Sequence, residues 1–247
     1  IMRFHIDDEI TQYYGAQAAN LISFLLTHQG SGSLTSFYKH KRWAKSIQTL
    51  LNFSGSGIIA YDVTINLTNE GYDNYKNVIN AFFKYVDVLR NEIAGGISEH
   101  VISNFTRIKE LEFRFNQIGD ILSFVVDMSS SVRLYSVKDI LTGSFLLSSP
   151  DKRLYQKMID ALNPGNILVL FKSCNEDHIG KGTLKDKWCG ARYKIVKDVE
   201  LDCLVPIDGS LFHLPRPNIF VPSKFSIASE RRKSSMTVPQ LVFSSKT

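Results

Sequence analysis

Alternating apolar and polar residues mark the strands of this chain. Residues 2–6 and 59–67 alternate strictly, which is the pattern of a strand with one buried face. Residues 167–171 are a continuous apolar run, and we predict a buried strand there. A shorter alternating stretch at residues 193–196 predicts an edge strand.

Longer segments carry apolar residues at steps of three and four, which is the helical pattern. The strongest segment is predicted to be one long helix that begins at Thr68, a suitable N-cap residue, and ends at the Gly95-Gly96 pair. Its predicted buried stripe is Tyr75, Val78, Ile79, Phe82, Phe83, Val86 and Leu89. Further helices are predicted over residues 8–27, 34–43, 98–115, 118–134 and 151–162. Residues 44–57 show neither pattern clearly, and we expect irregular chain there.

Strands and helices are mixed without strict alternation, which favours an α+β fold over a parallel, doubly wound sheet. The chain has 247 residues, of which 44% are hydrophobic, so a sizeable core is expected. Four of the seven prolines follow Leu214, and we predict one domain over residues 1–213 and a linker over residues 214–247. Because residues 1–6 read as a strand already under way, we expect the domain to be truncated at its N-terminus.

Charge and cysteine content argue against several classes of protein. The net charge is +5, but the basic clusters contain no interleaved aromatic residues that would stack on bases, so no nucleic-acid partner is predicted. The longest apolar runs fall far short of about 18 residues, so no membrane partner is predicted either. Three widely separated cysteines form no disulfide framework, which favours a reducing compartment and a cytoplasmic location.

The chain shows no catalytic or metal-binding motif of its own. None of its six histidines lies within one helical turn of another, whereas a zinc site needs closely spaced ligands. A Gly-x-Ser-x-Gly nucleophile elbow and a complete phosphate-binding loop are also missing. We therefore predict no catalytic residue and no metal ligand within this sequence.

Six short motifs nevertheless occur in a fixed order along the chain. They are His28-Gln-Gly-Ser-Gly-Ser-Leu34, Leu67-Thr-Asn-Glu-Gly71, Phe113-Arg-Phe115, Asp139-Ile-Leu-Thr-Gly143, Trp188-Cys-Gly-Ala-Arg-Tyr193 and Leu214-Pro-Arg-Pro-Asn-Ile-Phe220. Together they resemble the second, non-catalytic domain of the insulinase-type zinc metallopeptidases, the group of insulin-degrading enzyme, nardilysin and fungal pheromone-processing proteases. The resemblance implies a two-layer sandwich, in which helices cover a mostly antiparallel sheet.

The resemblance also implies a function for the intact parent protein. Members of this family bind Zn²⁺ through a His-x-x-Glu-His motif in their first domain, and that motif is absent here. The resemblance therefore implies a zinc metalloendopeptidase that holds its Zn²⁺ outside this fragment and cleaves peptides, propeptides or small unfolded proteins. This domain would pack against the other domains of the same chain and form part of the substrate chamber. The alternative is a catalytically dead member that acts as a scaffold or assembly partner.

One motif carries a candidate binding site by resemblance. In the family, the segment that matches residues 28–34 lines an exosite for the amino terminus of the substrate peptide. The candidates carried over are His28, Gln29, Gly30, Ser31, Gly32, Ser33 and Leu34. Gln29 replaces the family's glutamate, and residues 47–51, which align with a second, Gly-Gly exosite segment, contain no glycine. Both departures weaken the expectation that this chain anchors substrates as the family does.

Overall fold

A four-stranded antiparallel sheet forms one layer of the molecule. The computed structural model describes residues 1–53, 59–117, 119–173, 184–196 and 207–222. The strand order is β2-β3-β1-β4, and every neighbouring pair is antiparallel. The strands are β1 (Met2–Ile6), β2 (Ala44–Phe53), β3 (Ile59–Leu67) and β4 (Ile167–Val169). A separate hairpin pairs β5 (Leu184–Lys185) with β6 (Arg192–Tyr193).

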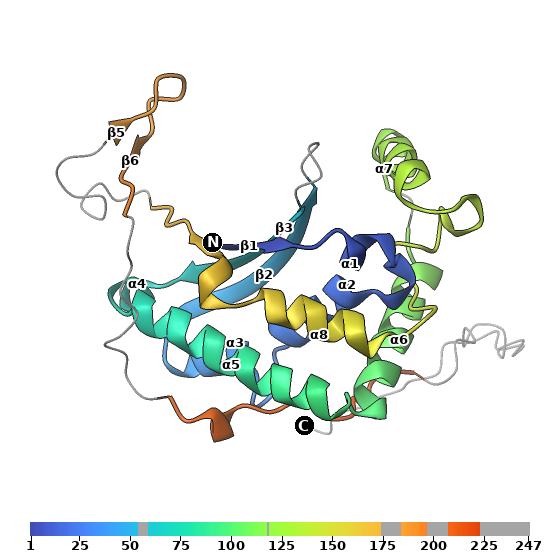
Figure 1. Cartoon of the computed structure of the whole chain (residues 1–247), viewed down its shortest axis with the longest axis horizontal. Coiled ribbons are helices and arrows are strands. Elements are labelled where there is room, and N and C mark those ends of the chain that lie inside the picture. Colours follow the sequence, from blue (N-terminus) through green and yellow to red (C-terminus); the bar gives the residue numbers. More distant parts are fainter. Residues whose placement is uncertain (54–58, 118, 174–183, 197–206, 223–247) are drawn as a thin grey trace, which may run out of the picture.

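Helices form the second layer, on one side of the sheet (Figure 1). This layer contains α2 (Ala18–Thr27), α3 (Leu34–His40), α5 (Tyr75–Gly95) and α8 (Lys152–Ala161). The remaining helices are α1 (Glu9–Gln12), α4 (Asn69–Asp73), α6 (Glu99–Arg114) and α7 (Ile121–Leu134), with short 3-10 turns at Tyr14–Ala16, Val137–Asp139, Pro164–Asn166 and Gly209–Leu211. The predicted α+β sandwich with a mostly antiparallel sheet is confirmed.

The core lies between the two layers. Met2, Phe4 and Ile6 of β1 are buried while the residues between them are exposed, and Phe4 stacks on Phe82 of α5 with 5.8 Å between ring centroids. Each large apolar side chain that is fully buried stabilises the fold by roughly 1.5–3 kcal/mol. Apolar contact between β1 and α5 therefore joins the two layers.

Buried tyrosines fasten the helices to each other. The Tyr38 hydroxyl of α3 donates to the carbonyl of Val78 in α5 at 2.7 Å. The Tyr85 hydroxyl of α5 donates to the carbonyl of Leu25 in α2 at 3.0 Å. These bonds satisfy polar groups that would otherwise be costly to bury, and they hold α2, α3 and α5 in one arrangement.

The predicted irregular stretch over residues 44–57 is wrong for residues 44–53, which form strand β2. A register irregularity lies between Ala44 and Ser46 where β2 pairs with β3. Such a bulge moves the following side chains to the opposite face, so that Ala44 and Ile47, three positions apart, are both buried. The bulge hides the two-residue period by which a strand is recognised in sequence.

Two predicted helices are interrupted. The helix expected over residues 8–27 breaks into α1, a 3-10 turn and α2. Tyr13 leaves the helical conformation after α1, and Gln17, with a left-handed φ of 49°, separates the 3-10 turn from α2. The helix expected over residues 68–95 divides at Asn74 into α4 and α5. Thr68 is confirmed as an N-cap, since its hydroxyl accepts a hydrogen bond from the Gly71 amide at 3.0 Å.

Strand β4 is not the buried strand that its apolar run predicts. It covers only residues 167–169, lies at the edge of the sheet and exposes 63% of Leu168. Ile167 and Val169 pack against the core, while Leu168 between them lies on the open face of the sheet, so burial alternates along the strand although its sequence does not. Within the described part of the chain, no helix is long and apolar enough to cross a membrane.

Candidate functional site

Residues 28–33 form the loop that joins α2 to α3, and Leu34 is the first residue of α3. The C-terminal end of the segment 28–34 is part of the fold, because Leu34 is fully buried and Ser33 is the N-cap of α3. The Ser33 hydroxyl accepts a hydrogen bond from the Ser36 amide at 3.1 Å, and the Ser33 amide donates to the Gly30 carbonyl at 3.3 Å. These contacts fix the backbone of the loop.

The two glycines of the loop lie tightly against histidine rings. Gly32 has a φ of +71°, and a Cβ placed on it would lie 2.2 Å from the ring of His213. A Cβ on Gly30 would lie 2.4 Å from the His28 ring. Glycine tolerates a positive φ and such close approach, whereas other residues do not. Gly32 therefore has a structural reason that is independent of any ligand, whereas Gly30 has no positive φ and meets only the end of a side chain that can move.

A returning segment, residues 207–215, covers the loop, and we call it the strap. The aromatic ring of Phe212 lies between Phe37 and Tyr85, at centroid distances of 5.3 and 5.4 Å. The His213 amide donates to the Gly32 carbonyl at 3.1 Å. The strap thus closes one side of the candidate site, which the local sequence pattern did not indicate.

The predicted domain boundary between residues 213 and 214 falls inside the strap and stays a prediction. At the end of the strap, the Pro215 carbonyl lies 3.0 Å from Nε2 of His100 in α6. Most of the predicted linker, residues 223–247, lies outside the described residues.

The histidine at the start of the loop is partly covered. Burial lowers the pKa of His28, and the nearby His213 lowers it further. Because its ordinary pKa is already near 6.5, the His28 ring is neutral at pH 7. It adds no positive charge to the loop.

The exposed part of the loop is Gln29 and Ser31. The side-chain Oε1 of Gln29 accepts a hydrogen bond from the Lys39 ammonium at 3.2 Å. Within the described residues, the backbone amides of Gln29 and Ser31 donate to no other backbone carbonyl. Residues 29–31 therefore offer backbone N–H donors, and the charged side chain beside them is the positive Lys39.

Residues 47–51, which align with the family's second exosite segment but lack its glycines, lie in β2, at the edge of the four-stranded sheet. Both helices that flank the loop, α2 and α3, contact β2. Among the described residues, only β3 pairs with β2, so its outer edge is not occupied by another strand there.

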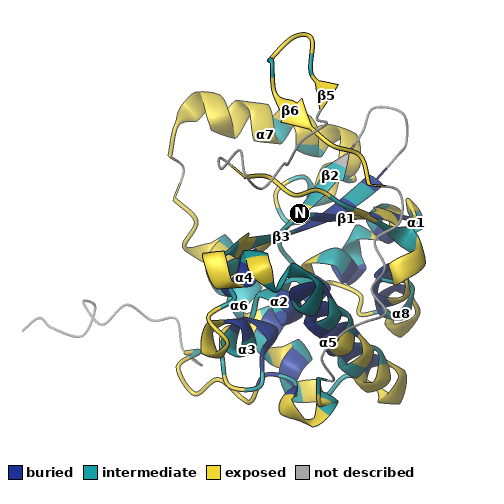
Figure 2. Cartoon of the chain, turned by 90° about the vertical axis from the view of Figure 1, so that its left-hand side faces the viewer, coloured by how far each residue is buried: buried dark blue, intermediate teal, exposed yellow. Residues whose placement is uncertain are grey.

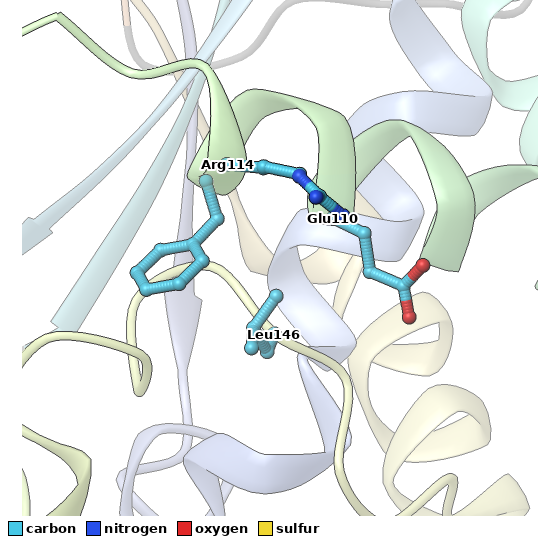
Figure 3. A pocket seen from close by; sticks show the side chains of 4 residues that line it. Glu110, Arg114 and Leu146 are labelled. Carbon is cyan, nitrogen blue, oxygen red and sulfur yellow. The ribbon is translucent and has the colours of Figure 1, made fainter. Parts of the chain in front are cut away.

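A hollow of about 340 Å³ lies elsewhere, at the end of α6 (Figure 3). It is lined by Glu110, Phe113, Arg114 and Leu146, and so includes part of the Phe113-Arg-Phe115 motif. The lining contains one carboxylate, Glu110, and one guanidinium, Arg114, on neighbouring helical turns, and none of its four residues is a nucleophile. We do not assign a binding role to it.

The described residues contain no group of three or more His, Cys, Asp or Glu side chains that could hold a metal ion. The donor set of this part of the chain therefore does not fit a zinc site. Of the three cysteines, Cys174 and Cys203 lie outside the described residues, and Cys189 is exposed with its thiol 3.0 Å from the Asp186 carboxylate. The absence of catalytic and metal-binding residues stays a prediction.

Comparison with known proteins gives consistent matches. Residues 113–247 match the sequence model of the middle or third domain of peptidase M16. Human nardilysin is 29% identical over 232 residues, which cover 87% of this chain and 19% of nardilysin. Bovine insulin-degrading enzyme is 26% identical over 234 residues, covering 94% of this chain and 22% of that enzyme. Insulin-degrading enzyme-like 1, peroxisomal, of Arabidopsis thaliana is 26% identical over 246 residues, covering 96% and 23%.

The fold has a counterpart among solved structures. The crystal structure of pitrilysin superposes with a TM-score of 0.62 at 18% identity, covering 67% of this chain and 17% of that chain. At this identity the likeness concerns the fold alone. The chain spans about a fifth of the length of the relatives it matches.

Proposed function

Because the chain belongs to the peptidase M16 family, whose middle or third domain it matches over more than half of its residues, we propose that it is a non-catalytic domain of a zinc metalloendopeptidase. The parent protein cleaves peptides or propeptides, and the Zn²⁺ is held by residues outside this fragment. The ordered motifs and the two-layer fold support this role. In it, the domain forms part of the substrate chamber and contacts the other domains of its own chain.

Within that role, residues 28–34 dock an extended peptide. The observation that carries this proposal is the division of the loop into a fixed half and an open half. Ser33 and Leu34 are buried, while Gln29 and Ser31 are exposed with amides that no described backbone carbonyl accepts. A fixed segment with backbone donors that no described backbone carbonyl accepts is suited to pairing with an extended peptide through main-chain hydrogen bonds.

Docking here depends on the peptide backbone more than on its amino-terminal charge. Gln29 is neutral, and Lys39 lies 3.2 Å from it. A free amino terminus would therefore meet no carboxylate at this position and one ammonium group. Complete recognition of the amino terminus, as the family resemblance implies, needs the acid that Gln29 replaces.

The test restores that acid in the full-length parent. We expect Gln29→Glu to lower the KM for peptides with a free amino terminus by roughly 3- to 10-fold, since an exposed to partly buried charge pair contributes about 1 kcal/mol. Acetylated peptides of the same sequence should be unaffected. Asn91→Asp, which adds the same charge at an exposed site on α5, is the matched control. Equal effects on free and acetylated peptides would remove the docking assignment.

A chelator separates the peptidase from the scaffold alternative. Activity of the parent on unstructured peptides should disappear when zinc is removed and return when it is added back. A parent that is inactive, or active regardless of the chelator, would contradict the peptidase assignment. Cytoplasmic location stays a prediction, and one plant relative carries the word peroxisomal in its name.

A further inference from the structure

Helix α7 projects from the body of the domain with its apolar residues uncovered. It lies on the side of the sheet opposite the helical layer, and the two views agree on this placement (Figures 1 and 2). None of its residues is buried. Seven of its large apolar side chains are exposed, namely Ile121, Leu122, Phe124, Val125, Val126, Val132 and Leu134.

The sequence of α7 has the apolar spacing of a helix that packs against another surface. Ile121, Val125, Met128 and Val132 follow each other at steps of four, three and four, so they form one stripe along the helix. Ser130 lies on the opposite side of the helix from this stripe, where its neighbours four positions away, Val126 and Leu134, are also exposed. Asp127 and Arg133 are the only charged residues within α7. An apolar stripe of this kind on a soluble domain marks an interaction surface.

The C-terminal end of α7 is firmly attached. The Asp139 carboxylate accepts hydrogen bonds from the Tyr14 hydroxyl at 2.8 Å and from the Ser136 hydroxyl at 2.7 Å. The rings of Tyr14 and Tyr135 meet edge to face at 5.0 Å. The helix is therefore presented at a defined place on the domain, which suits a permanent partner better than an adaptable one.

The helix also needs a partner for its own stability. At 14 residues it is near the length at which an isolated helix is marginal in water. Three valines and four serines reduce its intrinsic preference for the helical state further. Packing of the apolar stripe against a partner would supply the stability that the intrinsic helix propensity of α7 does not provide.

We propose that the apolar stripe of α7 is the docking surface for another domain of the same parent polypeptide. That domain would present an apolar surface with few charges, because α7 brings almost no charge with which to pair. Relatives of this chain are about five times longer, so further domains are covalently linked to it. A tethered partner acts at an effective concentration near the millimolar range for short linkers, which favours it over a second, separate copy.

The inference rests on the proposed function only in taking the chain as one domain of a longer protein. It requires neither zinc nor peptide cleavage. An inactive parent can therefore still confirm the docking of α7, and an active parent can still refute it.

The test places a photo-crosslinking residue, benzoylphenylalanine, at Val125 in the full-length parent, with Ser130 as the control position on the opposite side of α7. We expect Val125 to crosslink within one polypeptide to peptides from outside residues 1–247, at least tenfold more efficiently than Ser130. A crosslink between two polypeptides would replace the tethered domain by a second copy. A crosslink to an added peptide substrate, to residues 1–247, or to nothing would overturn the proposal.

A second measurement does not depend on crosslinking. In the parent, Val125→Asp should speed amide exchange of α7 by tenfold or more, because it places a charge in the interface, while Ser130→Asp should leave exchange unchanged. Equal exchange in both variants and the unmodified parent would show that the stripe is not covered. If the Val125→Asp variant fails to fold, the benzoylphenylalanine crosslink at position 125 still tests the proposal.

Discussion

Asp62 shows how one buried charge is accommodated in the sheet. Only 6% of this residue is exposed. Nε and Nη2 of Arg3 donate to its two carboxylate oxygens at 2.7 Å each, and the Asn52 amide donates to Oδ2 at 2.7 Å. The hydrogen bonds from Arg3, more than any other cause, lower the pKa of Asp62. The bidentate geometry makes this a stronger contact than an ordinary surface pair.

Replacing the arginine should reveal the pair through its pH dependence. Since the pKa of Asp62 is lower in the folded than in the unfolded state, the pair stabilises the fold fully above the unfolded value, about pH 4. The stabilisation is lost as the pH falls through the folded-state pKa. We expect Arg3→Met to lower the free energy of unfolding by about 1–3 kcal/mol at pH 7 and by progressively less below pH 4, as measured by urea denaturation.

Arg90→Met is the comparison for that experiment. Arg90 pairs with Asp87 and Asp160, whose side chains are 53% and 50% exposed, so its loss should cost less than about 1 kcal/mol. If Arg3→Met costs the same at pH 3 as at pH 7, the charge of Asp62 is not the cause.

Gly71 shows that a sequence motif can be matched to a family without revealing the contact that requires its glycine. A Cβ on Gly71, in the Leu67–Gly71 motif, would lie 1.8 Å from the backbone oxygen of Trp43. The sequence marks the position as part of a family pattern. It does not show the partner, because Trp43 lies in an earlier segment that only folding brings to α4.

At the scale of elements, α3 depends on a cap that lies within the candidate peptide-docking loop. Ser33 is buried and caps the helix, whereas Ser31 is exposed two positions earlier. The same seven residues therefore combine a structural role and a candidate binding role. Stability measurements can separate the two.

We expect Ser33→Ala to lower the free energy of unfolding by about 0.5–2 kcal/mol, as loss of an N-cap does elsewhere. Ser31→Ala should change stability by less than about 0.5 kcal/mol. Chemical denaturation of the two variants side by side gives the answer. Similar losses in both would mean that the cap does not act as the geometry indicates.

The elements also show where pattern reading succeeds and where it fails. Strands β1 and β3 alternate cleanly, and their predicted bounds agree with the structure. Strand β2 was missed because its bulge shifts the period. Hydrophobic periodicity indicates which residues of a strand face the core. A bulge inserts one extra residue, which shifts the alternation by one position, so the two-residue period is no longer visible in the sequence.

At the scale of the whole molecule, the strap packs a late segment of the chain against its N-terminal half. Phe212 is 5% exposed and contacts both α3 and α5 through Phe37 and Tyr85. The adjoining His213 bonds to the loop at Gly32. The position of the candidate loop is thus set by residues about 180 positions later in the sequence.

Removing the aromatic anchor should loosen the loop. We expect Phe212→Ala to destabilise the protein by about 3–5 kcal/mol and to speed amide exchange in residues 28–33. Leu211→Ala, at a neighbouring side chain that is 55% exposed, should do neither. Hydrogen exchange followed by mass spectrometry resolves the loop peptide, and unchanged exchange in Phe212→Ala would show that the strap does not hold it.

The sequence by itself determined the α+β class, the strands β1 and β3, the helical segments and the family, because these depend on local periodicity and on motifs in a fixed order. Only the tertiary structure decided that β2 lies at the sheet edge, that the strap closes over the candidate loop and that α7 extends uncovered from the body. The physical reason is that burial and pairing are relations between distant segments. A residue pattern can show which side of an element is apolar, but the packing of the whole chain decides what covers it.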